Sequence, residues 1–232
     1  MIRTAVADGV CTVTLDRPET RNALRPADLT ALEAAIEEAS APVLYLEGAG
    51  EAFCAGADLA AVAELDAATA APFAAHGQRV ANALAGYDGA VVAGIDGAAR
   101  GGGLELALAC DVRLATPDAT FAEPGVTLGL FGAWGGTTRL PDVVGLGNAM
   151  DLGLSGHVVN AERAREMGLV SRITSTPREV AREFAANNAA ALRTVKGLTR
   201  EQGDREDLED AEASAFAALI EAGATDRLDR PG

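Results

Sequence analysis

The sequence predicts an α/β protein with a mostly parallel sheet, because short apolar runs alternate with stretches of helical spacing. Such runs, each of a length typical of a buried strand, are residues 43–46, 91–95 and 111–115. A β-hairpin is expected before them, since two alternating segments, residues 4–6 and 10–15, flank the turn pair Asp8-Gly9. The repeated order of strand, helix and strand favours parallel pairing in one core.

The helices are predicted from apolar residues that recur every three or four positions, as at Leu29, Leu32 and Ile36. Residues 60–87 are rich in alanine and predicted to be helical, with Pro72 near a helix start and Gly86 near its end. A glycine-punctuated connection follows residue 129, and the chain beyond it is expected to be mostly helical. Helices are expected over residues 141–154, 160–167, 177–200 and 205–221, and a strand at 169–173.

Composition narrows the class of protein. With 232 residues, 49% hydrophobic and 23% charged, the chain can bury one large core with an appendage. The net charge of −15 argues against nucleic acid and anionic membranes as partners, although a local basic patch could hold a phosphate-bearing ligand. Three cysteines and two histidines give no disulfide framework or zinc-ligand spacing, so no metal is expected. No apolar run of membrane-spanning length and no signal peptide is recognised, which predicts a cytoplasmic protein.

The most informative stretch is Gly101-Gly102-Gly103, which leads into an apolar helix that contains Glu105. Three glycines allow a sharp turn and bring backbone N–H groups close to a ligand. A carboxylate on such an apolar helix has two explanations. Glu105 is either a structural group paired with an Arg or a backbone donor, or a base that faces a pocket.

Four blocks of sequence resemble the enoyl-CoA hydratase/isomerase family, the crotonases, in order and spacing. They are Leu15-Asp16-Arg17-Pro18 with Asn22-Ala23-Leu24, then residues 53–59, residues 101–107 with Cys110-Asp111, and Gly135-Gly136-Thr137 with Arg139-Leu140. The resemblance implies a crotonase-like (ClpP/crotonase) spiral of ββα units over residues 1–190. It also implies a helical region at 191–232 that helps form a homotrimer or hexamer, and an acyl-CoA substrate with no cofactor besides its coenzyme A.

The family's chemistry explains the small residues in these blocks. A thioester reacts at its α and β carbons when the charge developing on its carbonyl oxygen is held as an enolate by two N–H donors. By matching positions, the donors in this chain are the backbone N–H groups of Ala57 and Gly102. Small residues let the ligand's carbonyl approach the main chain. Nearby Cys54 could suggest a nucleophile, but no base lies near it in sequence, so a buried thiol is expected.

Hydratases of the family place two glutamates around a water, and this chain matches only one of them. Glu105 matches the glutamate that activates the water, whereas an ungapped match puts Gly125 at the position of the glutamate that handles the α-carbon proton. Glu123 lies two residues earlier in a short extended segment, so its side chain is expected on the same face as residue 125. Two readings remain: Glu123 replaces the missing group, or it is a solvated or ion-paired surface residue.

The resemblance also implies contacts with the substrate. Arg21 falls where relatives carry a basic residue near the CoA phosphates, and Ala55, Asp58 and Leu59 are expected to line the adenine and pantetheine path. Trp134 is expected in the acyl pocket, with core packing as the alternative. Two departures weaken the expected hold on CoA. Ala60 stands where relatives often have a lysine, and residues 226–232 end without the usual aromatic and basic segment.

The expected activity is therefore that of an acyl-CoA enzyme, nominally an enoyl-CoA hydratase, with Glu105 as the retained carboxylate. A single carboxylate beside an enolate site would also suit isomerisation, decarboxylation or hydrolysis of an acyl-CoA. A member that binds acyl-CoA without catalysis is the alternative from another class. The direction in which Glu105 points distinguishes these readings.

Overall fold

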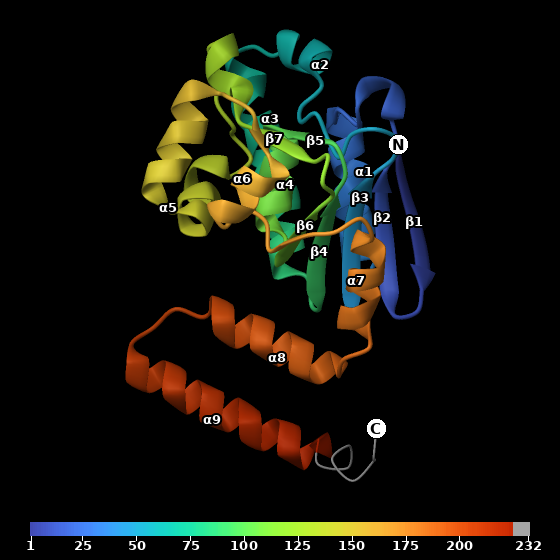
Figure 1. Cartoon of the computed structure of the whole chain (residues 1–232), viewed down its shortest axis with the longest axis vertical. Coiled ribbons are helices and arrows are strands. Elements are labelled where there is room, and N and C mark those ends of the chain that lie inside the picture. The colour runs from blue at the N-terminus through green and yellow to red at the C-terminus, as the bar shows by residue number, and fades with distance from the viewer. Residues whose placement is uncertain (225–232) are drawn as a thin grey trace.

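The structure, a computed structural model, describes residues 1–224, and its elements follow the predicted α/β order (Figure 1). The strands are β1 (Ile2–Ala7), β2 (Val10–Leu15), β3 (Val43–Gly48), β4 (Ala90–Ile95), β5 (Ala98–Arg100), β6 (Val112–Ala115), β7 (Thr120–Ala122), β8 (Val159–Asn160) and β9 (Arg172–Ile173). The α-helices are α1 (Pro26–Glu37), α2 (Leu59–Ala63), α3 (Ala67–Gly86), α4 (Gly102–Ala109), α5 (Gly136–Ser155), α6 (Ala161–Glu166), α7 (Pro177–Ala185), α8 (Ala189–Arg200) and α9 (Arg205–Glu221). Two short 3-10 helices are η1 (Pro18–Thr20) and η2 (Pro124–Leu128).

The main sheet confirms the expected parallel core. Its six strands lie in the order β1-β2-β3-β4-β6-β9, and only the β1–β2 hairpin in it is antiparallel. Asp8 and Gly9 form the turn of that hairpin with positive φ angles, as the Asp-Gly pair predicts. A second sheet, in the order β5-β7-β8, lies beside the first and carries the chain toward η2.

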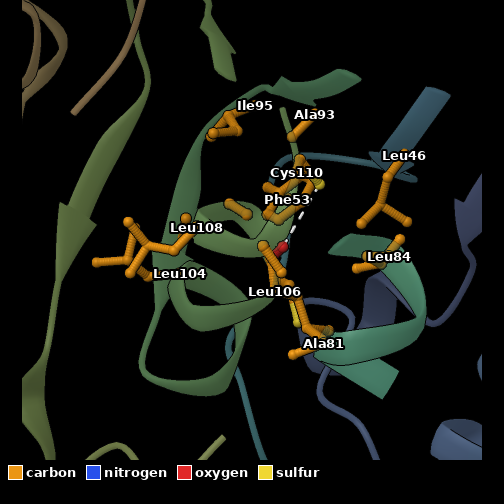
Figure 2. Close-up of a cluster of buried hydrophobic side chains, with 14 of the residues drawn as sticks. Leu46, Phe53, Ala81, Leu84, Ala93, Ile95, Leu104, Leu106, Leu108 and Cys110 are labelled. Carbon is orange, nitrogen blue, oxygen red and sulfur yellow. Dashed lines mark hydrogen bonds between the residues drawn. The ribbon is translucent and has the colours of Figure 1, made fainter. Parts of the chain in front are cut away.

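Helix α4 is central to the core, because all eight of its residues are buried. Leu106 points toward Ala81, while Leu104 and Leu108 lie on another side of the helix, and all three belong to the buried cluster of Figure 2 together with Phe53 from the loop after β3. A helix that is apolar all round belongs in a protein interior rather than at its surface. Glu105 is therefore buried together with its helix. Burial of a carboxyl group costs free energy unless the group finds hydrogen-bond partners.

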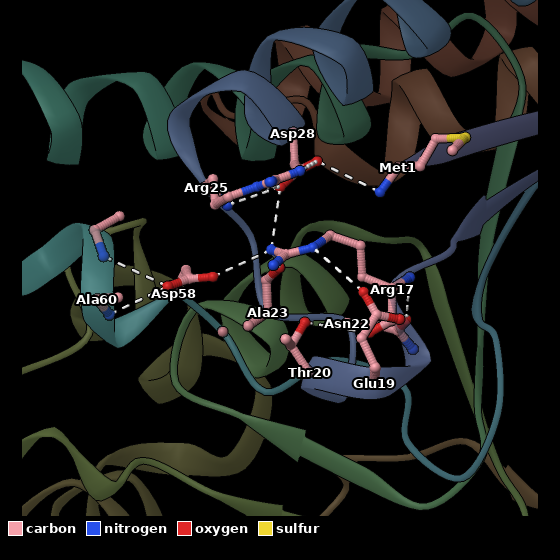
Figure 3. Close-up of polar contacts among 12 residues, drawn as sticks. Met1, Arg17, Glu19, Thr20, Asn22, Ala23, Arg25, Asp28, Asp58 and Ala60 are labelled. Atoms are coloured by element: carbon pink, nitrogen blue, oxygen red, sulfur yellow. Dashed lines mark hydrogen bonds and ion pairs between the residues drawn. The ribbon is translucent and has the colours of Figure 1, made fainter.

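An ion-pair network ties the first loop to the helices around it (Figure 3). The Arg17 guanidinium donates to Asp58 at 3.1 Å and to Asp28 at 3.4 Å, so it joins the loop before η1 to the starts of α1 and α2. Asp28 also accepts two bonds from the Arg25 side chain. Although burial opposes it, this bonding holds the pKa of Asp28 well below its usual range.

Three expectations about secondary structure are wrong in detail. Pro72 lies inside α3 rather than near its start, because Asp66 caps the helix with bonds to the N–H groups of Ala68 and Thr69. The helix expected over 177–200 is two helices, and the Asn188 side chain caps the second of them. Helix α5 begins at Gly136, five residues before the expected start.

The last two described helices lie below the core in Figure 1. Helix α8 reaches the core through Lys196, which lies 3.0 Å from Asp111 and also donates to two backbone carbonyls, and through Arg200, which lies 2.6 Å from Asp111. Helices α8 and α9 have no buried residues of their own. The C-terminal segment 226–232 noted above lies outside the described residues. In the described part of the chain, no helix combines the length and the apolar character needed to cross a bilayer.

Candidate active site

The site is built around the turn that leads into α4. Gly101 has φ +44°, which only glycine adopts easily, and it ends β5 and starts the helix. The loop of residues 54–57 packs against this turn, with Arg100 N–H donating to the Cys54 carbonyl at 2.9 Å. A Cβ atom on Gly103 would lie 2.4 Å from that carbonyl, and one on Gly56 would lie 3.0 Å from the Gly102 nitrogen. The small residues therefore serve the protein's own close packing here.

The two N–H groups expected to bind a thioester carbonyl remain free. Ala57 lies in a parallel bridge with Leu24, whose bonds use the Gly56 carbonyl and the Asp58 N–H and leave the Ala57 N–H out. Gly102 is the first residue of α4, so its N–H has no acceptor within the helix. Over residues 1–224, neither N–H has a hydrogen-bond acceptor.

Glu105 lies in the first turn of α4 and is buried, with 1% of its surface exposed. One carboxylate oxygen, Oε1, accepts the N–H of Trp134 at 2.9 Å and the N–H of Gly136 at 2.6 Å. Burial raises the pKa of Glu105, while these two bonds and the charge of Arg139 oppose that shift. Backbone donors therefore hold one oxygen, as the structural reading expects, whereas the reading of Glu105 as a base stays a prediction, since Glu105 itself does not line the pocket described below.

Glu123 is the least expected feature of the site. It follows β7, it is 7% exposed, and neither of its carboxyl oxygens has a hydrogen-bond partner within the described chain. Burial, and next the charge of Glu105, raise the pKa of Glu123 to about 8. The reading of Glu123 as a solvated or ion-paired surface residue is therefore wrong.

The two carboxyl groups are neighbours, and both pack against Gly132. A Cβ atom on Gly132 would lie 2.8 Å from Oε2 of Glu123 and 2.9 Å from Oε1 of Glu105. A Cβ atom on Gly136 would likewise lie 2.8 Å from Oε1 of Glu105. Gly132 and Gly136 thus let the carboxyl groups pack directly against the main chain, where any side chain would collide with them.

The Cβ position of Gly125 does not face these carboxyl groups. A Cβ atom there would meet the backbone of Phe131 at 2.8 Å, and Glu123 and Gly125 do not share a strand face because η2 begins at Pro124. The expectation that both side chains would lie on one face of an extended segment is wrong for that reason. A proline after Glu123 fixes the turn, and this is the signal that the strand ends there.

An apolar pocket of about 350 Å³ opens next to the carboxyl groups. Glu123, Gly132 and Gly136 contribute to its wall, and the lining continues along α5 through Leu146, Met150 and Leu154. Glu123 is the one charged residue that lines it within the described chain. Ala57, Gly102 and Trp134 do not line this pocket.

The residues expected to hold CoA lie near one another. Arg21 is exposed, has φ +53°, and accepts the Ala55 N–H on its carbonyl at 2.9 Å. Leu59 is 62% exposed. The Asp58 side chain is engaged by the protein itself, because it binds Arg17 and caps α2 through the N–H groups of Ala60 and Ala61 (Figure 3).

Trp134 is buried in the main core, and its ring lies against two glycines and Phe73. Cβ atoms on Gly77 and Gly102 would lie 2.1 and 2.4 Å from ring atoms of Trp134. The ring therefore packs over the start of α4, while the Trp134 backbone binds Glu105. Cys54 is buried as expected, and burial raises the pKa of its thiol to about 12, which keeps it protonated at neutral pH.

Fold and site together define an α/β protein with two buried carboxyl groups beside an apolar pocket. Residues 5–221 match the family model described as enoyl-CoA hydratase/isomerase. A crotonyl-CoA hydratase of Syntrophomonas wolfei is 34% identical over 216 residues, which cover 87% of this chain and 83% of the relative. The crystal structure of an enoyl-CoA hydratase from Bacillus anthracis superimposes with a TM-score of 0.91 at 32% identity, over 98% of this chain and 93% of that one.

The chain therefore belongs to the enoyl-CoA hydratase/isomerase family and has the crotonase fold. A methylglutaconyl-CoA hydratase of Mus musculus is also similar, at 37% identity over 67% of this chain and 52% of that protein. Sequence reasoning found the family, Glu105 and the glycine turn. It missed Gly132 as the residue against which both carboxyl groups pack, since nothing in the sequence links that residue to Glu105 and Glu123.

Proposed function

We propose that this protein is an enoyl-CoA hydratase, which adds water across the α,β double bond of an acyl-CoA thioester. The observation that carries the proposal is the placement of Glu105, a buried carboxylate held by two backbone N–H groups in the same helical turn that begins with the free N–H of Gly102. The names of the relatives support the same reaction class.

In the proposed reaction the N–H groups of Ala57 and Gly102 bind the thioester oxygen. Negative charge grows on that oxygen as the β carbon is attacked, and each preorganised donor stabilises it by about 2.7–4 kcal/mol in comparable sites. The Glu105 carboxylate accepts a proton from water, whose oxygen bonds to the β carbon. Fixing Oε1 by two donors orients the carboxylate without a change of structure during the reaction.

The rest of the substrate would lie outside the reacting centre. Arg21 would meet the CoA phosphates, and Ala55 and Leu59 would contact the adenine and pantetheine. Asp58 would contribute through its backbone, since its side chain is used by Arg17. We further propose that no cofactor is needed beyond the substrate's coenzyme A, that the protein is cytoplasmic, and that it assembles as a homotrimer or hexamer through residues 191–232.

The direct test is to incubate the protein with crotonyl-CoA and follow loss of the enoyl absorbance and formation of 3-hydroxybutyryl-CoA. Glu105→Gln should lower kcat by about 100- to 10,000-fold, since it removes the base without changing the side-chain shape. Glu162→Gln, an exposed residue in α6, serves as the matched control and should match the wild-type rate.

Other outcomes separate the alternatives. Hydration that survives Glu105→Gln would overturn the mechanism. Isomerised, decarboxylated or hydrolysed products from a panel of acyl-CoAs would assign one of those single-carboxylate reactions instead. Binding of acyl-CoAs with no turnover of any of them would identify a non-catalytic family member.

A further inference from the structure

Glu123 has no structural explanation within the fold. Burying a carboxyl group without a partner costs free energy, and nearly all buried polar groups in native proteins have a hydrogen bond. Both oxygens of Glu123 lack one, and no other buried side-chain oxygen or nitrogen in residues 1–224 does. A hydrophobic residue of similar size would serve the packing of the β7–η2 junction better. This points to a chemical rather than a stabilising role for the group.

The surroundings of Glu123 point to one use for it. Oε2 of Glu123 and Oε1 of Glu105 both lie within 3 Å of the Cβ position of Gly132, so the two carboxyl groups are neighbours, and the side chain of Glu123 lines the apolar pocket. Among the elements packed against it, α4 brings one charged group, Glu105, and the lining from η2 and α5 brings none. A molecule in the pocket would therefore contact Glu123, the direct neighbour of Glu105.

We propose that Glu123 supplies the second carboxyl group of the reaction, a proposal that rests on the proposed hydratase function. Glu123 lies two residues before the position that an ungapped match to the family assigns to this group. Because η2 begins at Pro124, the chain turns directly after Glu123 and directs residue 125 toward the backbone of Phe131. The side chain that remains next to Glu105 is that of Glu123.

The two groups differ in the form they hold at neutral pH. Two backbone N–H bonds favour the ionised form of Glu105, while Glu123 has no donor to stabilise a charge and lies beside an ionised neighbour. Its pKa of about 8 keeps Glu123 protonated at pH 7. Glu105 is then the base and Glu123 the acid.

The proton balance of the step follows. An O–H bond of water breaks, its oxygen bonds to the β carbon, and its proton goes to the Glu105 carboxylate. The π electrons move to the α carbon through the enolate, and that carbon takes the proton of Glu123. The product gains one water, Glu105 ends protonated and Glu123 ionised, and transfer of one proton from Glu105 to Glu123 restores the starting state. No oxidant, reductant or metal is required.

The test compares Glu123→Gln with wild type, with Glu105→Gln and with the exposed control Glu162→Gln, using crotonyl-CoA. We expect Glu123→Gln to lower kcat by about 100- to 10,000-fold, because it keeps the shape but removes the transferable proton. The KM should change less than about threefold, since binding of CoA does not involve this group. Glu123→Asp retracts the carboxyl group by one methylene and should also be slow, which covers the case in which the Gln variant does not fold.

The outcomes are distinct. A Glu123→Gln enzyme within about twofold of wild type, with Glu105→Gln inactive, would overturn the role of Glu123 and leave the proposed function standing. A wild-type protein that hydrates no enoyl-CoA would overturn the proposed function and this role with it. Loss of activity in both glutamine variants, with normal thermal unfolding, supports the pair.

A second inference concerns the acyl chain, and it rests on the pocket rather than on Glu123. The part of the lining contributed by α5 is apolar except for Thr137, and it includes Leu140, Leu146, Met150 and Leu154. The pocket of about 350 Å³ is larger than a crotonyl tail needs, since its volume equals roughly ten water-sized groups. We infer that this enzyme prefers uncharged, medium-chain enoyl-CoAs, whose tails would lie along α5.

Gly153 offers a specific way to test this preference. It lines the pocket, and a Cβ atom there would meet no atom within 4 Å, so a larger side chain can enter the pocket without disturbing the helix. Gly147 lies on the same helix, has the same open surroundings and does not line the pocket, so it provides the matched control.

The experiment measures kcat/KM for enoyl-CoAs of increasing chain length and for one with a distal carboxylate. In the wild type, kcat/KM should rise about fourfold for each added methylene until the pocket is filled, and the carboxylate should be disfavoured because nothing in the lining pairs with it. In Gly153→Leu, kcat/KM should no longer rise with chain length, while turnover of crotonyl-CoA stays within about threefold of wild type. In Gly147→Leu, kcat/KM should still rise with chain length as in the wild type. An equal chain-length dependence in the wild type and both variants, or no rise in the wild type, would overturn the inference.

Discussion

The start of α4 and the junction of β7 with η2 each bury one glutamate, but they treat the carboxyl group in opposite ways. At the start of α4, Glu105 accepts two backbone N–H bonds. At the junction, Glu123 accepts none. Both side chains are buried to a similar degree, so burial alone does not distinguish them. The difference lies in the hydrogen-bond donors. It makes Glu105 the base and its neighbour Glu123 the acid.

The largest effect is expected from a substitution that displaces both carboxyl groups at once. Gly132→Ala would place a methyl group within 3 Å of both carboxyl groups, at 2.8 and 2.9 Å from the nearest oxygens. We expect kcat for crotonyl-CoA to fall at least about 100-fold, because the methyl group would push both carboxyl groups out of their positions. The control is Gly147→Ala, which meets no atom within 4 Å and should retain the wild-type rate. Full activity in Gly132→Ala would show that the placement of the two carboxyl groups against Gly132 does not matter for the reaction.

The pH dependence of kcat/KM, which reports the pKa values of the free enzyme, should sharpen the comparison. The base must be ionised, so activity should fall as the pH drops through the raised pKa of Glu105, on which burial, the two N–H bonds and Arg139 act. The acid must be protonated, so activity should also fall as the pH rises through about 8, the pKa of Glu123. The residual activity of Glu123→Gln should lack the alkaline limb. An alkaline limb that survives in this variant would assign it to another group.

A smaller effect is expected from restoring a glutamate at the position where relatives carry it. Gly125→Glu should not raise hydratase activity, because its Cβ atom would collide with the backbone of Phe131 at 2.8 Å. We expect instead a loss of about 1–3 kcal/mol in the free energy of unfolding, from overpacking at η2. Thermal unfolding and the crotonyl-CoA assay measure the two effects. A clear gain in kcat would show that residue 125 can reach the substrate.

The smallest effect concerns stability. The pKa of Glu123 rises from 4.5 to about 8 on folding, so the unfolded chain releases this proton at lower pH than the folded protein. The group therefore destabilises the fold progressively as the pH rises from about 4.5 to 8. Glu123→Gln should gain roughly 1–3 kcal/mol in stability relative to wild type between pH 5 and pH 8, measured by urea unfolding. If the unfolding free energies of Glu123→Gln and wild type differed by the same amount at pH 5 and pH 8, the raised pKa of Glu123 would be contradicted.

Much of the fold could be predicted from the sequence, because its signals are local. The Asp8-Gly9 hairpin, the apolar strands and the helix with Leu29 and Leu32 follow from turn chemistry and periodicity. The errors arose where local signals compete. Asn188 caps a new helix inside a long helical pattern, and a single residue type does not reveal that break.

The site was predicted only in part, because its decisive feature is a contact between distant segments. Glu105 could be found from the glycines before it. The environment of Glu123 could not, since its burial depends on η2 and α5, and its lack of donors is a property of the folded chain. An alignment without gaps compares positions along the sequence, whereas the turn at Pro124 decides which side chain reaches Glu105.

The measurement closest to the central claim is the infrared carbonyl band of protonated carboxylic acids near neutral pH. Glu123 should give such a band in the wild type, and the band should vanish in Glu123→Gln and disappear on titration near pH 8. It should remain in Glu105→Gln, because burial is the main cause of the raised pKa. A band that persists in Glu123→Gln and is lost in Glu105→Gln, or no band in the wild type, would contradict the division of the two glutamates into acid and base.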